Sequence, residues 1–151
     1  MTFDKGFNAS SNVAATLLSQ RLGRDKFQLF NKKLGFGKKT GISLPNEQTG
    51  KIDFNYEIEV VNASFGQGMS VTPIQMVQAF TSVTNNGDVL KPYIVKKVVD
   101  PVTNKVILEN NRTVIGKVAS IATTEKVIDL LDGVVIFYWE GSSGYKYKTD
   151  I

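Results

Sequence analysis

Residues 72–83, TPIQMVQAFTSV, carry the clearest helix signal in the chain. Thr72 can serve as the N-cap, Pro73 suits the first helical position, and Gln75 can reach back to the cap residue. The sequence NNG at residues 85–87 is typical of a helix end. The pattern therefore predicts a helix with one apolar face, made of Met76, Val77, Phe80 and Val83.

Two further helices are expected before this one. The first follows Asn12 and ends at Gly23, because apolar residues recur between them at helical spacing. The second begins at Asp25 as the N-cap, with Gln28 as its capping-box partner and a buried stripe of Phe27, Phe30 and Leu34. Residues 35–50, GFGKKTGISLPNEQTG, are predicted to form a loop because they are rich in Gly, Pro and Asn.

The C-terminal part of the chain combines strand and helix signals. Two β-rich runs surround the sequence DPVTN at residues 100–104, which predicts a hairpin. A last helix is expected from about Thr123, with Gly133 near its end and a buried face of Val127, Leu130, Leu131 and Val134. A terminal strand is expected to pack the aromatic residues Tyr138, Trp139, Tyr145 and Tyr147. The alternative is that they line an opening beside an active site. This order indicates an α+β fold, or part of one.

Composition excludes several classes of protein. The chain has 151 residues, 42% of them hydrophobic, which is enough for the core of one domain. The 18 basic and 14 acidic residues are interspersed, so a solvated surface is favoured over a nucleic-acid groove. Because the chain has no Cys and no His, we expect no disulfide and no metal site, and any acid–base chemistry must use Lys, Ser, Tyr or carboxylates. No membrane span or signal peptide is apparent.

Residues 8–14, NASSNVA, place Ser10, Ser11 and Asn12 at the start of a predicted helix. Ser and Asn are leading N-cap residues, each worth about 1 kcal/mol, and capping alone explains the triplet. A chemical role is the alternative. A serine hydroxyl can pass a proton when a neutral lysine lies nearby, and an asparagine amide can both donate to and accept from a peptide bond. An S-x-N element of this kind occurs in serine acyl transferases.

Four stretches in a fixed order extend this pattern over nearly the whole chain. They are GFNASSNVA (6–14), KLGFGKKTGISLPNEQTGKI (33–52), NASFGQGMSVTPIQMVQAF (62–80) and NNGDVLKPYIVKKVVDP (85–101). By these stretches the chain resembles the transpeptidase domain of class B penicillin-binding proteins, from about Phe7 onward. Each motif alone is weakly specific, but four in the order of the family are strongly specific.

The resemblance implies a fold, an activity and two site residues. The fold is a helical lobe packed on a mainly antiparallel sheet, and the activity is cross-linking of peptidoglycan stem peptides through a serine acyl-enzyme that β-lactams also acylate. Ser10 matches the serine implicated in proton relay to the leaving amine, and Asn12 matches the asparagine that holds the acyl donor or the β-lactam amide. Ser11 is the variable middle position and is assigned no role. The implied partners are stem peptides, β-lactams and cell-wall synthesis proteins, the implied location is the outer face of the cell membrane, and no cofactor is implied.

Two motifs of the family are not found where it has them. No Ser with Lys three residues later precedes Ser10, so the nucleophile of the S-x-x-K motif is missing. Lys39-Thr40-Gly41 spells the third motif, but it lies in the predicted loop and is expected to be structural. Residues 148–150 are better placed, yet Asp150 stands where the motif has glycine, which the substrate backbone must approach closely. We therefore expect residues 1–151 to be an internal, inactive part of a transpeptidase domain, with the authentic Lys-Thr-Gly beyond Ile151.

Two other classes of protein stay open from the sequence. The first is a non-catalytic interaction module of a cell-wall assembly. The second is a β-lactam sensor or β-lactamase relative, which shares the motif set but not the FGQGMSVTPIQM region at residues 65–76. Glycines in that region are expected to form a tight turn rather than a ligand cradle.

Overall fold

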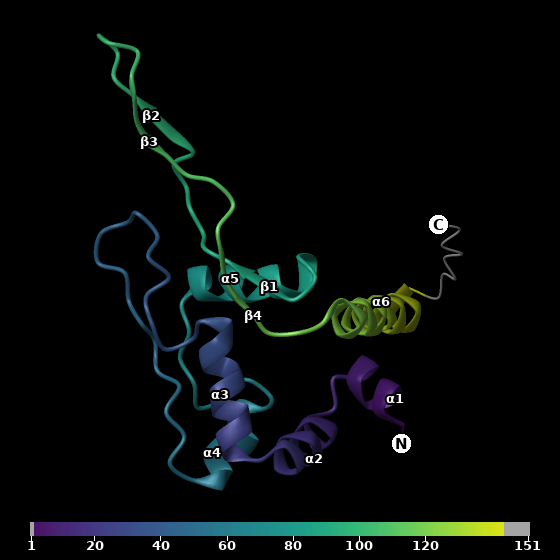
Figure 1. Cartoon of the computed structure of the whole chain (residues 1–151). Helices are drawn as coiled ribbons and strands as arrows, with labels where there is room; N and C mark the ends of the chain where they lie inside the picture. The colour runs from purple at the N-terminus through teal and green to yellow at the C-terminus, as the bar shows by residue number, and fades with distance from the viewer. Residues whose placement is uncertain (1, 144–151) are drawn as a thin grey trace.

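The computed structural model describes residues 2–143 and shows an α+β chain of helices with two small antiparallel sheets. The helices and strands follow one another from α1 (Phe3–Asn8) through α2 (Asn12–Leu22), α3 (Arg24–Leu34), α4 (Glu57–Ala63), α5 (Pro73–Thr84), β1 (Asp88–Leu90), β2 (Lys97–Val99), β3 (Val106–Glu109) and β4 (Val114–Lys117) to α6 (Ile121–Ser143). β1 pairs with β4, and β2 pairs with β3 (Figure 1). The expected fold class, a helical part with antiparallel strands, is confirmed.

The capping of α5 is as predicted. The Thr72 hydroxyl accepts a hydrogen bond from the Gln75 amide at 3.3 Å, and the Gln75 side chain accepts one from the Thr72 amide at 2.9 Å. Pro73 occupies the first turn, and the helix ends before Asn85. Two hydrogen bonds and a proline thus set the start of this helix within four residues.

The apolar face of α5 is not the face that the helix buries. The residues that α5 buries are Gln75, Gln78, Ala79 and Ser82, whereas Met76, Val77 and Phe80 are exposed by 39%, 57% and 55%. The reason is the side chain of Gln75, whose Nε2 donates to the carbonyl oxygens of Lys38 at 2.7 Å and Thr49 at 2.8 Å. These bonds to the 38–49 segment turn the polar side of α5 inward.

The hydrophobic core lies where α3, α4 and α5 meet the extended segment between α3 and α4. Its buried members are Phe36, Ile52, Phe54, Val60, Ala63 and Ala79. Phe27 and Leu34 of α3 pack against this cluster, and the Phe27 and Phe54 rings meet edge to face at 5.5 Å. Their expected burial is confirmed in part, since Phe30 of the same predicted stripe is 44% exposed.

Several helix ends differ from the prediction. α3 starts at Arg24 after Gly23, which has φ of +81° and offers no side-chain cap, so the proposed Asp25–Gln28 capping box is wrong. α6 starts at Ile121, where the Ser120 hydroxyl accepts a hydrogen bond from the Thr123 amide at 3.2 Å. It continues to Ser143, so Gly133 lies within the helix.

The continuation of α6 also corrects the expected terminal strand. Tyr138 and Trp139 lie on α6, whereas Tyr145, Tyr147 and residues 148–150 lie outside the described residues. Two short helices were not predicted. They are α1 and α4, and α4 is stabilised at its start by Glu59, whose carboxylate accepts hydrogen bonds from the Asn55 and Tyr56 amides.

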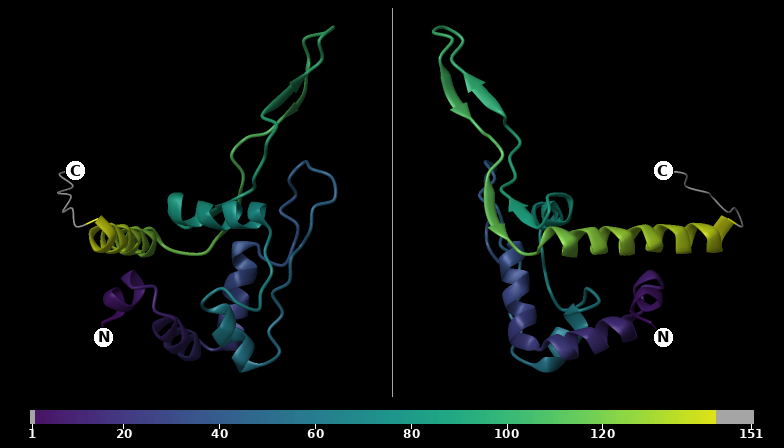
Figure 2. Two further views of the ribbon diagram at one scale, coloured as in Figure 1. Left: turned by 180° about the vertical axis from the view of Figure 1, so that it is seen from behind. Right: turned by 45° about the vertical axis from the view of Figure 1, so that its right-hand side comes forward.

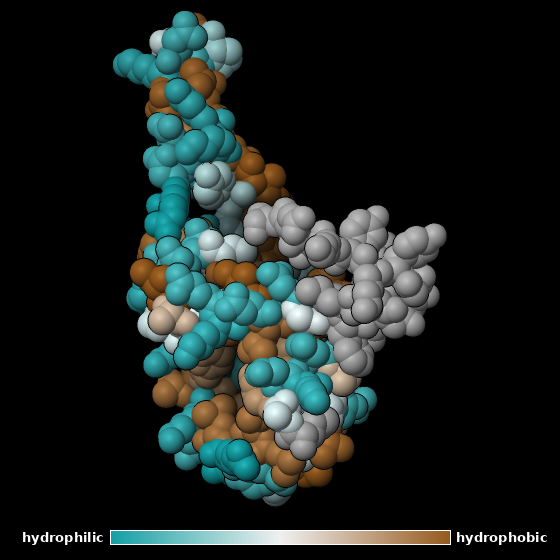
Figure 3. Space-filling view, turned by 90° about the vertical axis from the view of Figure 1, so that its right-hand side faces the viewer, coloured by the Kyte–Doolittle hydropathy of each residue, from teal (hydrophilic) through white to brown (hydrophobic). Residues whose placement is uncertain are grey.

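The predicted hairpin around residues 100–104 is confirmed and projects from the rest of the molecule (Figures 1 and 2). The Asp100 carboxylate accepts hydrogen bonds from the Val102 and Thr103 amides at 2.8 and 3.2 Å, which closes the turn. Hydrophobic and hydrophilic residues are interleaved along the hairpin (Figure 3). Among residues 2–143, no helix is both long and apolar enough to cross a lipid bilayer.

Candidate active site

Ser10 occupies a backbone position that usually requires glycine. Its φ is +47°, in the left-handed region. The Ser10 amide donates to the Phe7 carbonyl at 2.9 Å and the Ser11 amide donates to the Gly6 carbonyl at 3.0 Å, which is the Schellman pattern at the end of α1. A non-glycine residue in this conformation costs about 1 kcal/mol or more, so the side chain of Ser10 is held at an energetic cost.

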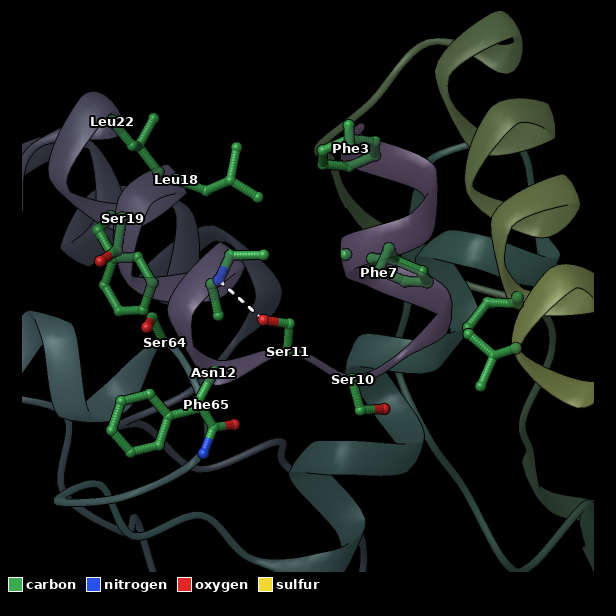
Figure 4. A pocket seen from close by; sticks show the side chains of 16 residues that line it. Phe3, Phe7, Ser10, Ser11, Asn12, Leu18, Ser19, Leu22, Ser64 and Phe65 are labelled. Carbon is green, nitrogen blue, oxygen red and sulfur yellow. Dashed lines mark hydrogen bonds between the residues drawn. The ribbon is translucent and has the colours of Figure 1, made fainter. Parts of the chain in front are cut away.

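The capping role suggested for the triplet belongs to Ser11. The Ser11 hydroxyl accepts a hydrogen bond from the Ala14 amide at 3.3 Å and so caps α2 (Figure 4). Asn12 is the first residue of α2, and its side chain, like that of Ser10, is exposed. Within the described part of the chain, neither the Ser10 hydroxyl nor the Asn12 amide forms a side-chain hydrogen bond, so both polar groups are available to a ligand.

Ser10 and Asn12 lie on the polar rim of one cavity of about 590 Å³. The cavity is formed by α1, α2, α6, Phe27 of α3 and the residues that follow α4 (Figure 4). Ser11 and Ser64 complete the polar groups near the rim, while Phe3, Phe7, Leu18, Leu22, Phe27, Phe65, Leu131 and Val134 line the apolar wall. The structure therefore places both predicted site residues at one opening that could receive a partly apolar ligand. Their polar groups point in different directions there (Figure 4).

The cavity lining supplies no ionisable side chain from the described residues. A serine hydroxyl is a weak nucleophile and a weak proton relay unless a base or a cation adjoins it. Among residues 2–143 there is also no cluster of three potential metal ligands. Proton transfer at Ser10 thus requires a titratable group from elsewhere.

Phe65 lines the cavity, although the sequence pattern assigns it no role in the site. It follows α4 and stands just before Gly66 and Gly68, whose φ values of +90° and +75° confirm the expected tight turn. The turn carries the Phe65 ring to the cavity that Asn12 borders (Figure 4). No local pattern indicates this contact, because the two residues are far apart in sequence and meet only through packing.

Lys39-Thr40-Gly41 forms a structural loop, as expected. The Glu47 carboxylate accepts hydrogen bonds from the Thr40 amide and the Thr40 hydroxyl, both at 2.6 Å, and from the Gly41 amide at 3.1 Å. Desolvation raises the pKa of Glu47, but the bonds from Thr40 and Gly41 and the charge of Lys39 outweigh it and hold the pKa below its ordinary value. The Thr40 and Gly41 amides are therefore already occupied by a carboxylate of the same chain.

We expect Glu47→Gln to reduce stability at pH 7 by less than about 1 kcal/mol, since the carboxylate is partly solvent-exposed. The lowered folded-state pKa of Glu47 means that its stabilisation is complete above the ordinary value of 4.5 and is lost as the pH falls through the folded-state pKa. The variant should consequently lose less stability than the wild type between pH 7 and pH 3. Urea unfolding followed by circular dichroism at both pH values measures this difference. Glu125→Gln on the exposed face of α6 is the control, and an unchanged acid dependence in Glu47→Gln would contradict the assignment.

Residues 1–141 match the family of penicillin binding protein transpeptidase domains, and the chain belongs to this family. Stage V sporulation protein D of Bacillus subtilis is 40% identical over 130 residues, which cover 83% of this chain and 20% of that protein. The peptidoglycan D,D-transpeptidase FtsI homolog of Mesostigma viride is 34% identical over 152 residues, covering 89% of this chain and 25% of that protein. The chain thus spans a fifth to a quarter of these relatives, and the resemblance to class B penicillin-binding proteins is confirmed.

Solved structures agree with this membership. Penicillin Binding Protein 2X from Streptococcus thermophilus superposes with a TM-score of 0.84 at 33% identity, over 88% of this chain and 19% of that one. Penicillin binding protein 3 from Mycobacterium tuberculosis, complexed with ampicillin, gives a TM-score of 0.80 at 32% identity, over 89% of this chain and 30% of that one. The fold of the chain is therefore that of part of a transpeptidase domain.

Proposed function

We propose that residues 1–151 are an internal part of a D,D-transpeptidase that cross-links peptidoglycan stem peptides through a serine acyl-enzyme and binds β-lactams. Two relatives support this: one is named a peptidoglycan D,D-transpeptidase, and another has been solved in complex with ampicillin. We place the whole protein at the outer face of the cell membrane, together with cell-wall synthesis proteins. It needs no cofactor.

The observation that carries this proposal is the backbone of Ser10. Ser10 occupies a strained, glycine-type position, and the neighbouring Ser11 performs the capping. Because the Ser10 hydroxyl caps no helix, this strain supports a chemical role for it. Ser10 relays a proton to the leaving amine when the acyl-enzyme forms. Asn12, on the same rim, holds the amide of the acyl donor through its amide group.

The nucleophile and its lysine come from an S-x-x-K segment N-terminal to Ser10, outside this sequence. That serine attacks the penultimate D-Ala carbonyl, the peptide bond breaks, and the released amine takes up the proton. A Lys-Thr-Gly segment beyond residue 151 completes the site. The spacing Ser-x-x-Lys does occur at Ser143 to Lys146, but C-terminal to Ser10, in the reverse order. Residues 1–151 alone therefore have no activated nucleophile.

Labelling with a fluorescent penicillin tests the proposal. The 151-residue chain should form no adduct that survives denaturation. The longer polypeptide, which contains residues 1–151 with both flanking motifs, should be labelled stoichiometrically and protected by unlabelled ampicillin. In that polypeptide we expect Ser10→Ala to slow acylation by roughly 10²- to 10⁴-fold, the usual contribution of a positioned proton carrier. Asn12→Ala should weaken penicillin binding about five- to tenfold through one lost hydrogen bond.

Ser43→Ala is the control, because Ser43 is an exposed loop residue that does not line the cavity. Denaturation-stable labelling of the 151-residue chain would overturn the assignment of the nucleophile to an outside segment. Unlabelled longer polypeptide would favour a non-catalytic module. Wild-type acylation by Ser10→Ala would remove Ser10 from the proton relay.

A further inference from the structure

Gly133 lies inside α6, where glycine is unfavourable. Glycine in the interior of a helix is less stable than alanine because it loses more conformational freedom on folding. Here the missing side chain allows a close approach. A Cβ at this position would lie 2.7 and 2.9 Å from the two terminal atoms of the Asn8 amide, closer than normal packing permits.

Asn8 is the last residue of α1, which lies beside α6 (Figure 2), and its side chain lies against Gly133. With its amide nitrogen turned toward α6, Asn8 donates to the Leu130 carbonyl of α6 and to the Asp4 carbonyl of α1, each at 3.3 Å. The same side chain thus joins the two helices. A methyl group at residue 133 would displace the amide from these two acceptors.

This contact determines where Ser10 lies. A helix of six residues is not stable in water by itself, so the orientation of α1 depends on the surface it packs against. Ser10 is held to the end of α1 by its amide bond to the Phe7 carbonyl and stands two residues after Asn8. Leu131 and Val134, on either side of Gly133, line the cavity that Ser10 borders. A shift of α1 on α6 would consequently move the Ser10 hydroxyl relative to Asn12.

We propose that Asn8 and Gly133 are positioning residues that hold Ser10 at the rim of the cavity by fixing α1 against α6. The catalytic consequence rests on the proposed function. The effect on the position of Ser10 does not rest on it, because that effect follows from the contact between Asn8 and Gly133. Two measurements separate the effect on the position of Ser10 from the effect on catalysis.

The first measurement uses the absence of cysteine from the chain. Ser10→Cys introduces a single thiol, whose rate of reaction with a disulfide reagent reports the local environment of residue 10. Residue 10 is already exposed, so this rate depends on how α1 holds the residue rather than on access to solvent. Adding Gly133→Ala should change the rate about fivefold, because the hydrogen bonds that join α1 to α6 are lost. Gly116→Ala is the matched control, because a Cβ at Gly116 would meet nothing within 4 Å.

The melting temperature of Gly133→Ala is a second test of the contact. It should fall if the contact with Asn8 matters and rise if it does not. If the contact were unimportant, Gly133→Ala would raise the melting temperature, since alanine favours the helix, and the thiol rate would equal that of Gly116→Ala. Either result would overturn the proposal. Asn8→Ala combined with Gly133→Ala removes the clash with the Asn8 amide, so the original thiol rate should be partly restored.

The second measurement is acylation of the longer polypeptide by the fluorescent penicillin. Gly133→Ala should lower the maximal acylation rate about fivefold while leaving the half-saturating penicillin concentration unchanged, because Asn12 is not displaced. A changed thiol rate with unchanged acylation would retain the contact but reject its catalytic consequence. If Ser10→Ala also left acylation unchanged, the proposed function would fail while the thiol result stood.

Discussion

Replacing Gln75 by leucine is expected to lower the free energy of unfolding by about 3–5 kcal/mol. Gln75 is fully buried, and its side chain bonds to the Lys38 and Thr49 carbonyls and to the Thr72 amide. Leucine fills a similar volume but leaves these three polar groups unpaired in the interior, and each unsatisfied group costs about 1–3 kcal/mol. The loss should also free the 38–49 segment from α5.

Urea unfolding of the 151-residue chain, followed by circular dichroism, measures the effect. Gln20→Leu is the matched control, since Gln20 is exposed on α2 and its replacement should change stability by no more than about 0.5 kcal/mol. A loss below about 1 kcal/mol in Gln75→Leu would show that the 38–49 segment does not depend on this side chain.

Ser10→Gly is expected to change stability and acylation in opposite directions. Glycine adopts the φ of +47° without steric cost, so the variant should be more stable by about 1 kcal/mol. The same change removes the hydroxyl, and acylation of the longer polypeptide should slow by roughly 10²- to 10⁴-fold. Ser10→Ala shares the catalytic loss but keeps the backbone strain, so only the glycine variant should gain stability.

Asn46→Gly provides the comparison for Ser10→Gly. Asn46 also has a positive φ, of +58°, but lies in the loop between α3 and α4, away from the cavity. Its replacement should leave penicillin acylation unchanged. Asparagine tolerates the left-handed region better than serine, so the gain in stability should be smaller. If Ser10→Gly were less stable than the wild type, the glycine-type position of Ser10 would not carry the strain inferred for it.

Elements decided by a few neighbouring residues were predictable from the sequence. The start of α5 depends on Thr72, Pro73 and Gln75 alone, and the hairpin turn depends on Asp100 and the amides that follow it. Both were predicted correctly. In each, the donor and acceptor are at most three residues apart, so tertiary packing does not alter the outcome.

Features decided by tertiary contacts were not predictable. The buried face of α5 is set by bonds from Gln75 to the distant Lys38 and Thr49 carbonyls, which outweigh the apolar pattern of Met76 and Phe80. α1 is too short to leave a periodic signal, and it depends on α6 for its position. The residue type alone does not reveal whether Ser10 or Ser11 caps a helix, because both side chains carry the same hydroxyl. The left-handed backbone of Ser10 distinguishes them.

The hairpin of β2 and β3 also offers a practical attachment point. Its turn stands apart from α1, α2 and α6 in all three ribbon views (Figures 1 and 2), none of its residues lines the cavity, and Val102 there is 89% exposed. Exposed turns of this kind are the places where a chain best accepts inserted residues. An epitope or a dye introduced at residues 102–104 would let the protein be immobilised or followed by fluorescence while the polar rim keeps its native surroundings.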